Sequence, residues 1–199
     1  MNNRNIRTTV TTKTLVLASV LTAVVVVLQV MAILTRAILP AFAINLVLIP
    51  IVIGSAIGGI KVGAWLGFVS GVAVLVSGDA ASFLSISIGG TIAVVLLKGL
   101  ASGVASALVY RIFENKNKYL AVIAAAIVCP VVNTGVFILG CFAFFMDTIR
   151  AWGSAMGFEN AFAYIILGMI GINFIIELVL NIILSPTVIR LLAIKEKHI

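Results

Sequence analysis

Charged residues are scarce in this chain, and their scarcity excludes a soluble globular domain. Of the 199 residues, 10% are charged and 63% are hydrophobic, and the mean hydropathy is +1.31. A soluble domain carries about 25% charged residues because its surface faces water. The surface of this protein must therefore face lipid, where every backbone amide needs an internal partner and only helices or closed barrels can span.

The period-two alternation of a membrane barrel is also missing. Segments such as Leu15–Leu34 and Ile92–Leu97 are apolar on every side instead. The sequence therefore predicts an all-α polytopic membrane protein.

Residues that carry catalytic or metal chemistry are few and scattered. The only histidine is His198, and Glu177 is the only acid well inside an apolar run. Cys129 and Cys141 have no metal-ligand spacing, and a cysteine inside a span usually behaves as a small hydrophobe. No phosphate-binding G-x-x-x-x-G-K-[ST] loop occurs. We therefore expect no enzyme activity, no cofactor and no metal site.

Six apolar runs have the length and character of spans, which need about twenty apolar residues. They form one transmembrane domain over residues 1–199, with helices near 14–35, 44–59, 62–76, 90–113, 119–146 and 161–192. Residues 77–89 and 147–160 are expected to be loops longer than a turn requires. The first run exceeds the 7–15 residues of a signal-peptide core, so we expect it to be a retained span.

Basic residues indicate how the helices are oriented. Ten of the 13 Lys and Arg residues fall at one side of the predicted bundle, together with both termini. The positive-inside rule places that side in the cytoplasm. The net charge of +7 then reflects topology and is no sign of nucleic-acid binding.

Polar side chains inside spans are costly and are functional candidates by default. Asn173, Glu177 and Asn181 recur at every fourth position, on one helix face, and Lys98 lies within another span. Lys98 either forms an ion pair with Glu177 that holds two helices together, or acts as counter-ion for an anionic solute in the outer half of the bundle. The helix start at Gly89–Thr91 would add a positive dipole end nearby.

Small residues spaced by four let helices approach closely in lipid. Gly63, Gly67 and Gly71 form one such stripe, and Gly99 and Gly103 form another, so we favour internal packing for both. A third set lies in the first span, where internal packing and docking of another membrane subunit both fit: Ala18, Ser19, Thr22 and Ala23.

The two outer connections have the composition of a lid. Asp79, Ser82 and Phe83 belong to a small, polar stretch suited to movement. Trp152 and Phe158 in the other connection either cover a pocket or belong to an interfacial aromatic belt.

Two stretches, Asn45–Gly54 and Gly63–Gly71, resemble the second and third helices of S components, the substrate-binding subunits of energy-coupling factor (ECF) vitamin transporters. The resemblance implies a six-helix bundle with cytoplasmic termini in the plasma membrane of a prokaryote. It also implies a transmembrane coupling subunit, contacted by the small residues of the first span, and two cytosolic ATPases. The vitamin would bind in the outer half, beneath the lid residues Asp79, Ser82, Phe83 and Trp152.

The segment Asn133–Phe137 and the outer loops resemble the pantothenate-type branch, with biotin, folate and riboflavin as alternatives. Pantothenate is a small carboxylate with amide and hydroxyl groups, which Lys98 and nearby amides can bind. The predicted substrate-binding residues are Asn45, Lys98, Asn133, Thr134, Asn173 and Glu177.

Two other classes stay open at this point. The first is an intramembrane enzyme that uses Glu177 and Lys98 as acid and base. The second is a structural membrane protein whose polar face serves only helix packing.

Overall fold

Long apolar helices make up the chain in the computed structural model, which describes residues 12–38 and 46–197. The helices are α1 (Thr12–Ile38), α2 (Leu48–Val76), α3 (Ala81–Leu84), α4 (Ile88–Phe113), α5 (Lys118–Phe144), α6 (Met146–Ala155), α7 (Ala161–Ala163), the π-helix η1 (Tyr164–Ile170) and α8 (Gly171–Lys197). No strand occurs in these two ranges. Five segments are long and apolar enough to cross a membrane: Thr12–Thr35, Leu48–Val76, Ile88–Phe113, Lys118–Phe144 and Ala161–Leu191. The structure thus agrees with an all-helical membrane protein.

Helix α2 is a hairpin rather than one straight rod. Gly59 has φ 73° and ψ −165°, a left-handed conformation that glycine adopts readily. Beyond this break Leu66 packs against Gly54 and Val62 against Gly58. In a straight helix Gly54 and Leu66 would be about 18 Å apart. The arms before and after Gly59 therefore run antiparallel, and the turn falls where the sequence analysis separated two short helices.

The second arm of α2 packs on α4 through glycines. A Cβ atom on Gly67 would collide with the carbonyl oxygen of Gly99, and one on Gly99 with that of Gly67. Gly63 and Gly103 form the same reciprocal contact one turn away. Only residues without a side chain allow this approach, so the predicted internal packing of these stripes is confirmed.

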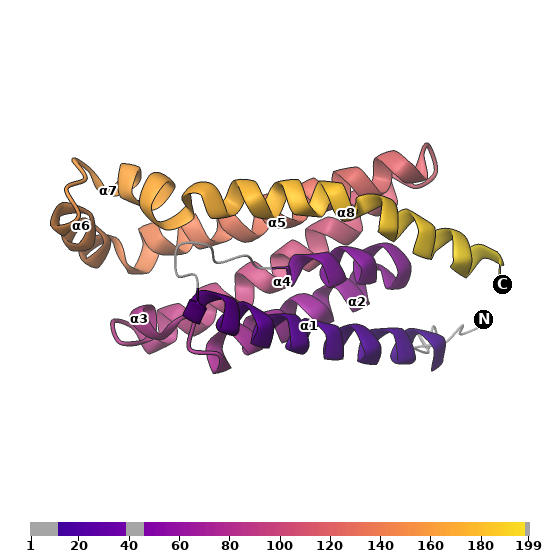
Figure 1. Cartoon of the computed structure of the whole chain (residues 1–199), viewed down its shortest axis with the longest axis horizontal. Helices are drawn as coiled ribbons and strands as arrows, with labels where there is room; N and C mark the ends of the chain where they lie inside the picture. The colour runs from indigo at the N-terminus through magenta and orange to yellow at the C-terminus, as the bar shows by residue number, and fades with distance from the viewer. Residues whose placement is uncertain (1–11, 39–45, 198–199) are drawn as a thin grey trace, which may run out of the picture.

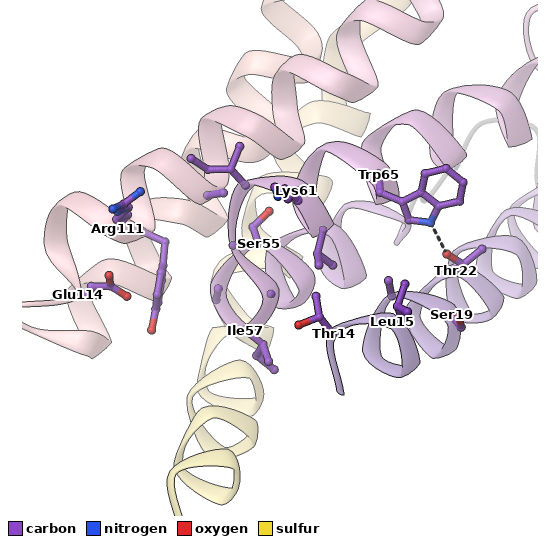
Figure 2. A pocket seen from close by; sticks show the side chains of 18 residues that line it. Thr14, Leu15, Ser19, Thr22, Ser55, Ile57, Lys61, Trp65, Arg111 and Glu114 are labelled. Atoms are coloured by element: carbon purple, nitrogen blue, oxygen red, sulfur yellow. Dashed lines mark hydrogen bonds between the residues drawn. The ribbon is translucent and has the colours of Figure 1, made fainter. Parts of the chain in front are cut away.

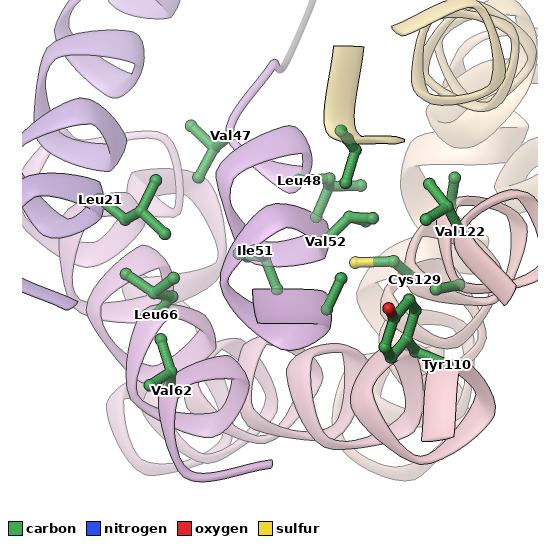
Figure 3. Packing of buried hydrophobic residues seen from close by; sticks show 14 of the residues in the cluster. Leu21, Val47, Leu48, Ile51, Val52, Val62, Leu66, Tyr110, Val122 and Cys129 are labelled. Atoms are coloured by element: carbon green, nitrogen blue, oxygen red, sulfur yellow. The ribbon is translucent and has the colours of Figure 1, made fainter. Parts of the chain in front are cut away.

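A core of buried apolar side chains joins α1, α2, α4, α5 and α8 (Figure 3). Leu21, Ile51, Leu66, Tyr110 and Cys129 belong to it. Both Cys129 and Cys141 are buried free thiols, as expected of small apolar side chains in a span.

The outer connections contain helices, which corrects the expectation of loops. Residues 77–89 hold the one-turn helix α3, and most of 147–160 belongs to α6. Helix α6 is amphipathic: Ile149 and Gly153 are buried, whereas Asp147 in its first turn can interact favourably with the helix dipole.

The last predicted helix is also interrupted. It begins with the short helix α7 and the π-helix η1, and Gly171 then leaves the helical region with φ 40° and ψ −137°. Gly153 of α6 lies against the side chain of Tyr164, where a larger residue would be crowded. This contact attaches the start of the segment to α6.

The two ends of the bundle differ (Figure 1). At one end, here the turn end, lie the start of α1, the turn of α2 at 58–61, the α4–α5 connection at 114–117 and the end of α8. At the other, the cap end, lie α3, α6 and α7. The exposed side chains of Lys61, Arg111 and Lys116 are at the turn end.

Candidate functional site

The candidate site is built around Lys98, a basic residue within a membrane-spanning helix. It lies in the half of α4 nearer the cap end and is half-buried. Its ammonium nitrogen is 5.4 Å from the centroid of the Phe137 ring on α5. A cation over an aromatic face is attracted by the ring quadrupole, more strongly where water is excluded.

Glu177 of α8 lies within electrostatic range of Lys98 but not in contact with it. Among the described residues, these two side chains form no ion pair, which would need a nitrogen–oxygen distance of 4.0 Å or less. The structure therefore does not show the helix-joining ion pair offered as one reading of the sequence.

The polar face of α8 divides into two parts. The buried side chain of Asn181 donates a hydrogen bond of 2.8 Å from Nδ2 to the backbone oxygen of Glu177. Asn173, one turn nearer the cap end than Glu177, has a buried Oδ1 with no hydrogen-bond donor among the described residues. The Asn181 side chain is thus hydrogen-bonded to its own helix. The Asn173 side-chain oxygen, in contrast, has no donor among the described residues and can accept a hydrogen bond from a ligand.

Asn133 and Thr134 are half-buried on α5. They precede Phe137 by four and three residues, so all three side chains lie on neighbouring positions of the helix surface. This places both predicted residues about one turn from the ring that covers Lys98. Asn45 lies outside the described residues.

Four aromatic rings cap the site. The Phe83 ring of α3 has its centroid 5.8 Å from Phe137, 5.0 Å from Phe145 and 5.7 Å from Trp152 of α6, each in an edge-on arrangement. The two outer connections named as lids therefore meet at Phe83 and Trp152. Ser82 is exposed beside this cluster.

Asp79 contacts a residue that the sequence analysis missed. Gln29 of α1 is buried, and its Nε2 donates to Asp79 Oδ2 at 2.6 Å and to Ser77 Oγ at 3.1 Å. A signal was available, because Gln29 is an uncharged polar residue within an apolar run and such residues are functional candidates by default. Its distance of 50 positions from Asp79 hid the contact.

The helix start expected to contribute a positive dipole end belongs to α4, the helix that also carries Lys98. Ser87 caps this helix by accepting a hydrogen bond of 3.2 Å from the Gly90 amide. At 1.5 Å per residue, Thr91 and Lys98 are about 10.5 Å apart along the axis. The contribution of this helix end to anion binding stays a prediction.

A groove of about 1100 Å³ lies toward the turn end, away from this site (Figure 2). Its walls are α1, the turn of α2 and the end of α4. Ala18, Ser19 and Thr22 line it, and Trp65 Nε1 donates to Thr22 Oγ1 at 3.0 Å across it. Ala23 is exposed on the same helix but does not line the groove. Of the predicted substrate-binding residues that the structure describes, none lines this groove.

The described side chains can bind an anion but hold no metal cluster. No group of three His, Cys, Asp or Glu residues within these ranges has the proximity of a metal site. Around Lys98 lie a cluster of aromatic rings and the amide side chains of α5 and α8.

Comparison with known proteins gives one match. The profile of a family described as ECF transporter, substrate-specific component, matches residues 13–189. No curated protein and no solved structure matches the chain.

Proposed function

The chain belongs to the family of ECF transporter substrate-specific components, and from this premise we propose that it captures a small carboxylate vitamin, with pantothenate favoured. Members of this family are the binding subunits of transporters and are not enzymes, and they act with the subunits of an ECF module. The chain is accordingly an integral membrane protein, and the plasma membrane of a prokaryote is its proposed location.

The position of Lys98 is the observation that carries the proposal. Its ammonium lies over Phe137 and forms no ion pair with Glu177. Phe137 in turn contacts Phe83, and Phe83 contacts Trp152. A cation in a medium of low dielectric constant gains most from an anionic partner. The carboxylate of a vitamin that enters from the cap end would supply that partner.

The remaining groups favour a ligand with hydrogen-bonding atoms along its length. Asn133, Thr134 and Asn173 come from two helices on which Phe137 and Glu177 also lie. Asp79 and Ser82 of the connection between α2 and α4 are retained in the proposal as vitamin contacts, and so is Asn45, which lies outside the described residues. Pantothenate offers one carboxylate, one amide and two hydroxyl groups, which suits this set; biotin, folate and riboflavin are the alternatives.

Calorimetric titration of the purified protein in detergent tests the function directly. We expect pantothenate to give a saturable signal near one molecule per chain. Biotin, folate and riboflavin are titrated under the same conditions. Saturable binding of one of these instead would reject pantothenate and keep the transporter function, whereas no binding of any of the four would contradict the proposed site.

The aromatic cap is proposed to slow vitamin release. Phe83→Ala removes three edge-on ring contacts, each of which contributes about 0.5–1.5 kcal/mol. We expect the dissociation rate to rise about 10-fold or more, since 1.4 kcal/mol corresponds to a factor of ten. Stopped-flow release of a labelled vitamin measures this rate.

Phe162→Ala provides the matched control, because Phe162 is an exposed ring of the cap end outside the cluster. Equal release rates in the two variants would show that the ring cluster does not act as a lid.

The groove at the turn end is proposed to lie at the contact with the coupling subunit. Ala18, Ser19 and Thr22 line it, and Ala23 lies exposed beside them. The turn end carries the basic side chains, so the positive-inside rule puts it in the cytoplasm, where the two ATPases would be.

Ser19→Trp fills this groove with a large ring. We expect recovery of the complete transporter by co-purification to fall at least about 10-fold, because overpacking a close contact is strongly unfavourable. Vitamin binding by the isolated chain should be unchanged. Val26→Trp, at an exposed α1 position outside the groove, is the control, and equal loss in both variants would refute a specific contact at Ser19.

A further inference from the structure

The side-chain amide of Gln29 is only partly hydrogen-bonded within the described part of the fold. The residue is 3% exposed, in the middle of an α1 helix whose other faces are largely apolar. Its amide nitrogen donates to Asp79 and Ser77. Its amide oxygen, Oε1, is buried and has no donor among the described residues.

The neighbours of the amide fix its orientation. Rotating the group by 180° would place Oε1 against the Asp79 carboxylate, and two acceptors repel each other. Nε2 must therefore face Asp79, at 2.6 Å, and Oε1 must face away from it. Burying a carbonyl oxygen without a donor is unfavourable, so such an atom in a binding protein points to a ligand.

A chain of contacts connects Gln29 with the proposed vitamin site. Asp79 lies within electrostatic range of Lys98. The same outer connection continues to Phe83, whose ring contacts Phe137, and Phe137 in turn lies against the Lys98 ammonium. Gln29 thus holds the beginning of a connection whose other end caps the cation.

Asn173 presents a second acceptor of the same kind. Its Oδ1 is buried without a donor in the described part of the chain, four residues from Glu177 on α8. Glu177 is the other carboxylate within electrostatic range of Lys98. Gln29 is thus hydrogen-bonded to one of these carboxylates, and Asn173 lies one helical turn from the other.

We infer that Gln29 is a specificity-determining residue of the vitamin site, where its Oε1 accepts a hydrogen bond from the ligand while Asn173 Oδ1 accepts another. This inference rests on the proposed function and narrows it. The ligand must carry a carboxylate together with at least two hydroxyl or N–H donors. Pantothenate meets this requirement, whereas nicotinate, a carboxylate without such donors, does not.

A thermodynamic cycle between protein and ligand tests the inference. The ligand series is pantothenate and its two analogues in which one hydroxyl group is replaced by hydrogen, with nicotinate as the donor-free carboxylate. We expect the unmodified protein to bind at least one of the deoxy analogues about 100-fold more weakly than pantothenate, because a site built to accept a hydroxyl rejects ligands that lack it. Gln29→Met, similar in size but without an acceptor, should lose most of that preference.

A purely structural role of Gln29 gives a different result. Gln29→Met would then weaken all ligands by one common factor and leave the ratio between pantothenate and its analogues unchanged, which would overturn the inference. Ser77→Ala is the matched control, since it removes one acceptor of the Nε2 group yet leaves Oε1 in place. It should keep the preference.

Two further outcomes separate this inference from the function on which it rests. If the unmodified protein binds none of pantothenate, biotin, folate and riboflavin, the proposed vitamin site is contradicted and this inference with it. If it binds pantothenate but also binds nicotinate equally well, only the inference fails. Should Gln29→Met not fold, Gln29→Asn keeps the amide but withdraws Oε1 by one methylene group, and it should show the same loss of preference.

Discussion

Replacing Lys98 with alanine is expected to weaken vitamin binding by about 100-fold or more. Lys98 is half-buried, and Phe137 is the ring closest to its ammonium group. Removing one partner of a buried charge pair costs about 3–5 kcal/mol because the other charge loses its compensation. A ligand carboxylate brought to this site would lose that stabilisation, and calorimetric titration would report the weaker affinity.

Two variants make the Lys98 result specific. Lys116→Ala removes a cation of the exposed α4–α5 connection and should leave affinity unchanged. Lys98→Arg keeps the charge and should retain part of the binding. Full affinity in a folded Lys98→Ala protein would mean that the carboxylate is bound elsewhere, and the counter-ion role would have to be abandoned.

Introducing side chains at the glycine contact between α2 and α4 is expected to lower the thermal stability of the protein more than any other substitution proposed here. In Gly67→Ala the new methyl group would collide with the Gly99 carbonyl oxygen, which cannot move without its helix. Overpacking of this kind costs about 1–3 kcal/mol. For a chain of this size the midpoint of thermal unfolding should fall by about 2–10 °C. The double variant with Gly99→Ala should fall further.

Gly135→Ala is the matched control for this experiment. Gly135 lies in α5, and an added Cβ would meet no atom within 4 Å. Alanine is the better helix former, so this variant should be as stable as the original protein or more so. Equal midpoints for Gly67→Ala and Gly135→Ala in detergent would show that the glycine contact does not limit helix approach.

Features that depend on local sequence could be predicted well. The apolar runs predict the long helices, and the four-residue spacing of Gly63 and Gly67 predicts a close helix contact because both properties repeat along one helix. The expected boundary between the helices near 44–59 and 62–76 coincides with the turn that Gly59 makes. Phe83 and Trp152 were assigned to lids from composition, although only the structure shows their rings in contact.

Features that depend on partners far along the chain could not be predicted in this way. Helix α6 was missed because its composition is that of a loop, and its burial comes from contacts such as that of Gly153 with Tyr164. The Gln29–Asp79 hydrogen bond joins residues 50 positions apart. The separation of Lys98 from Glu177 depends on how helices α4 and α8 are placed, which no spacing rule gives.

The hairpin in α2 has a consequence for how the chain is threaded. Residues after Gly59 run back alongside those before it. The start of α1, the turn of α2 and the end of α8 lie at one end of the bundle (Figure 1). One left-handed glycine thus lets a single apolar stretch return toward the end from which it came, which a straight helix of the same length could not do.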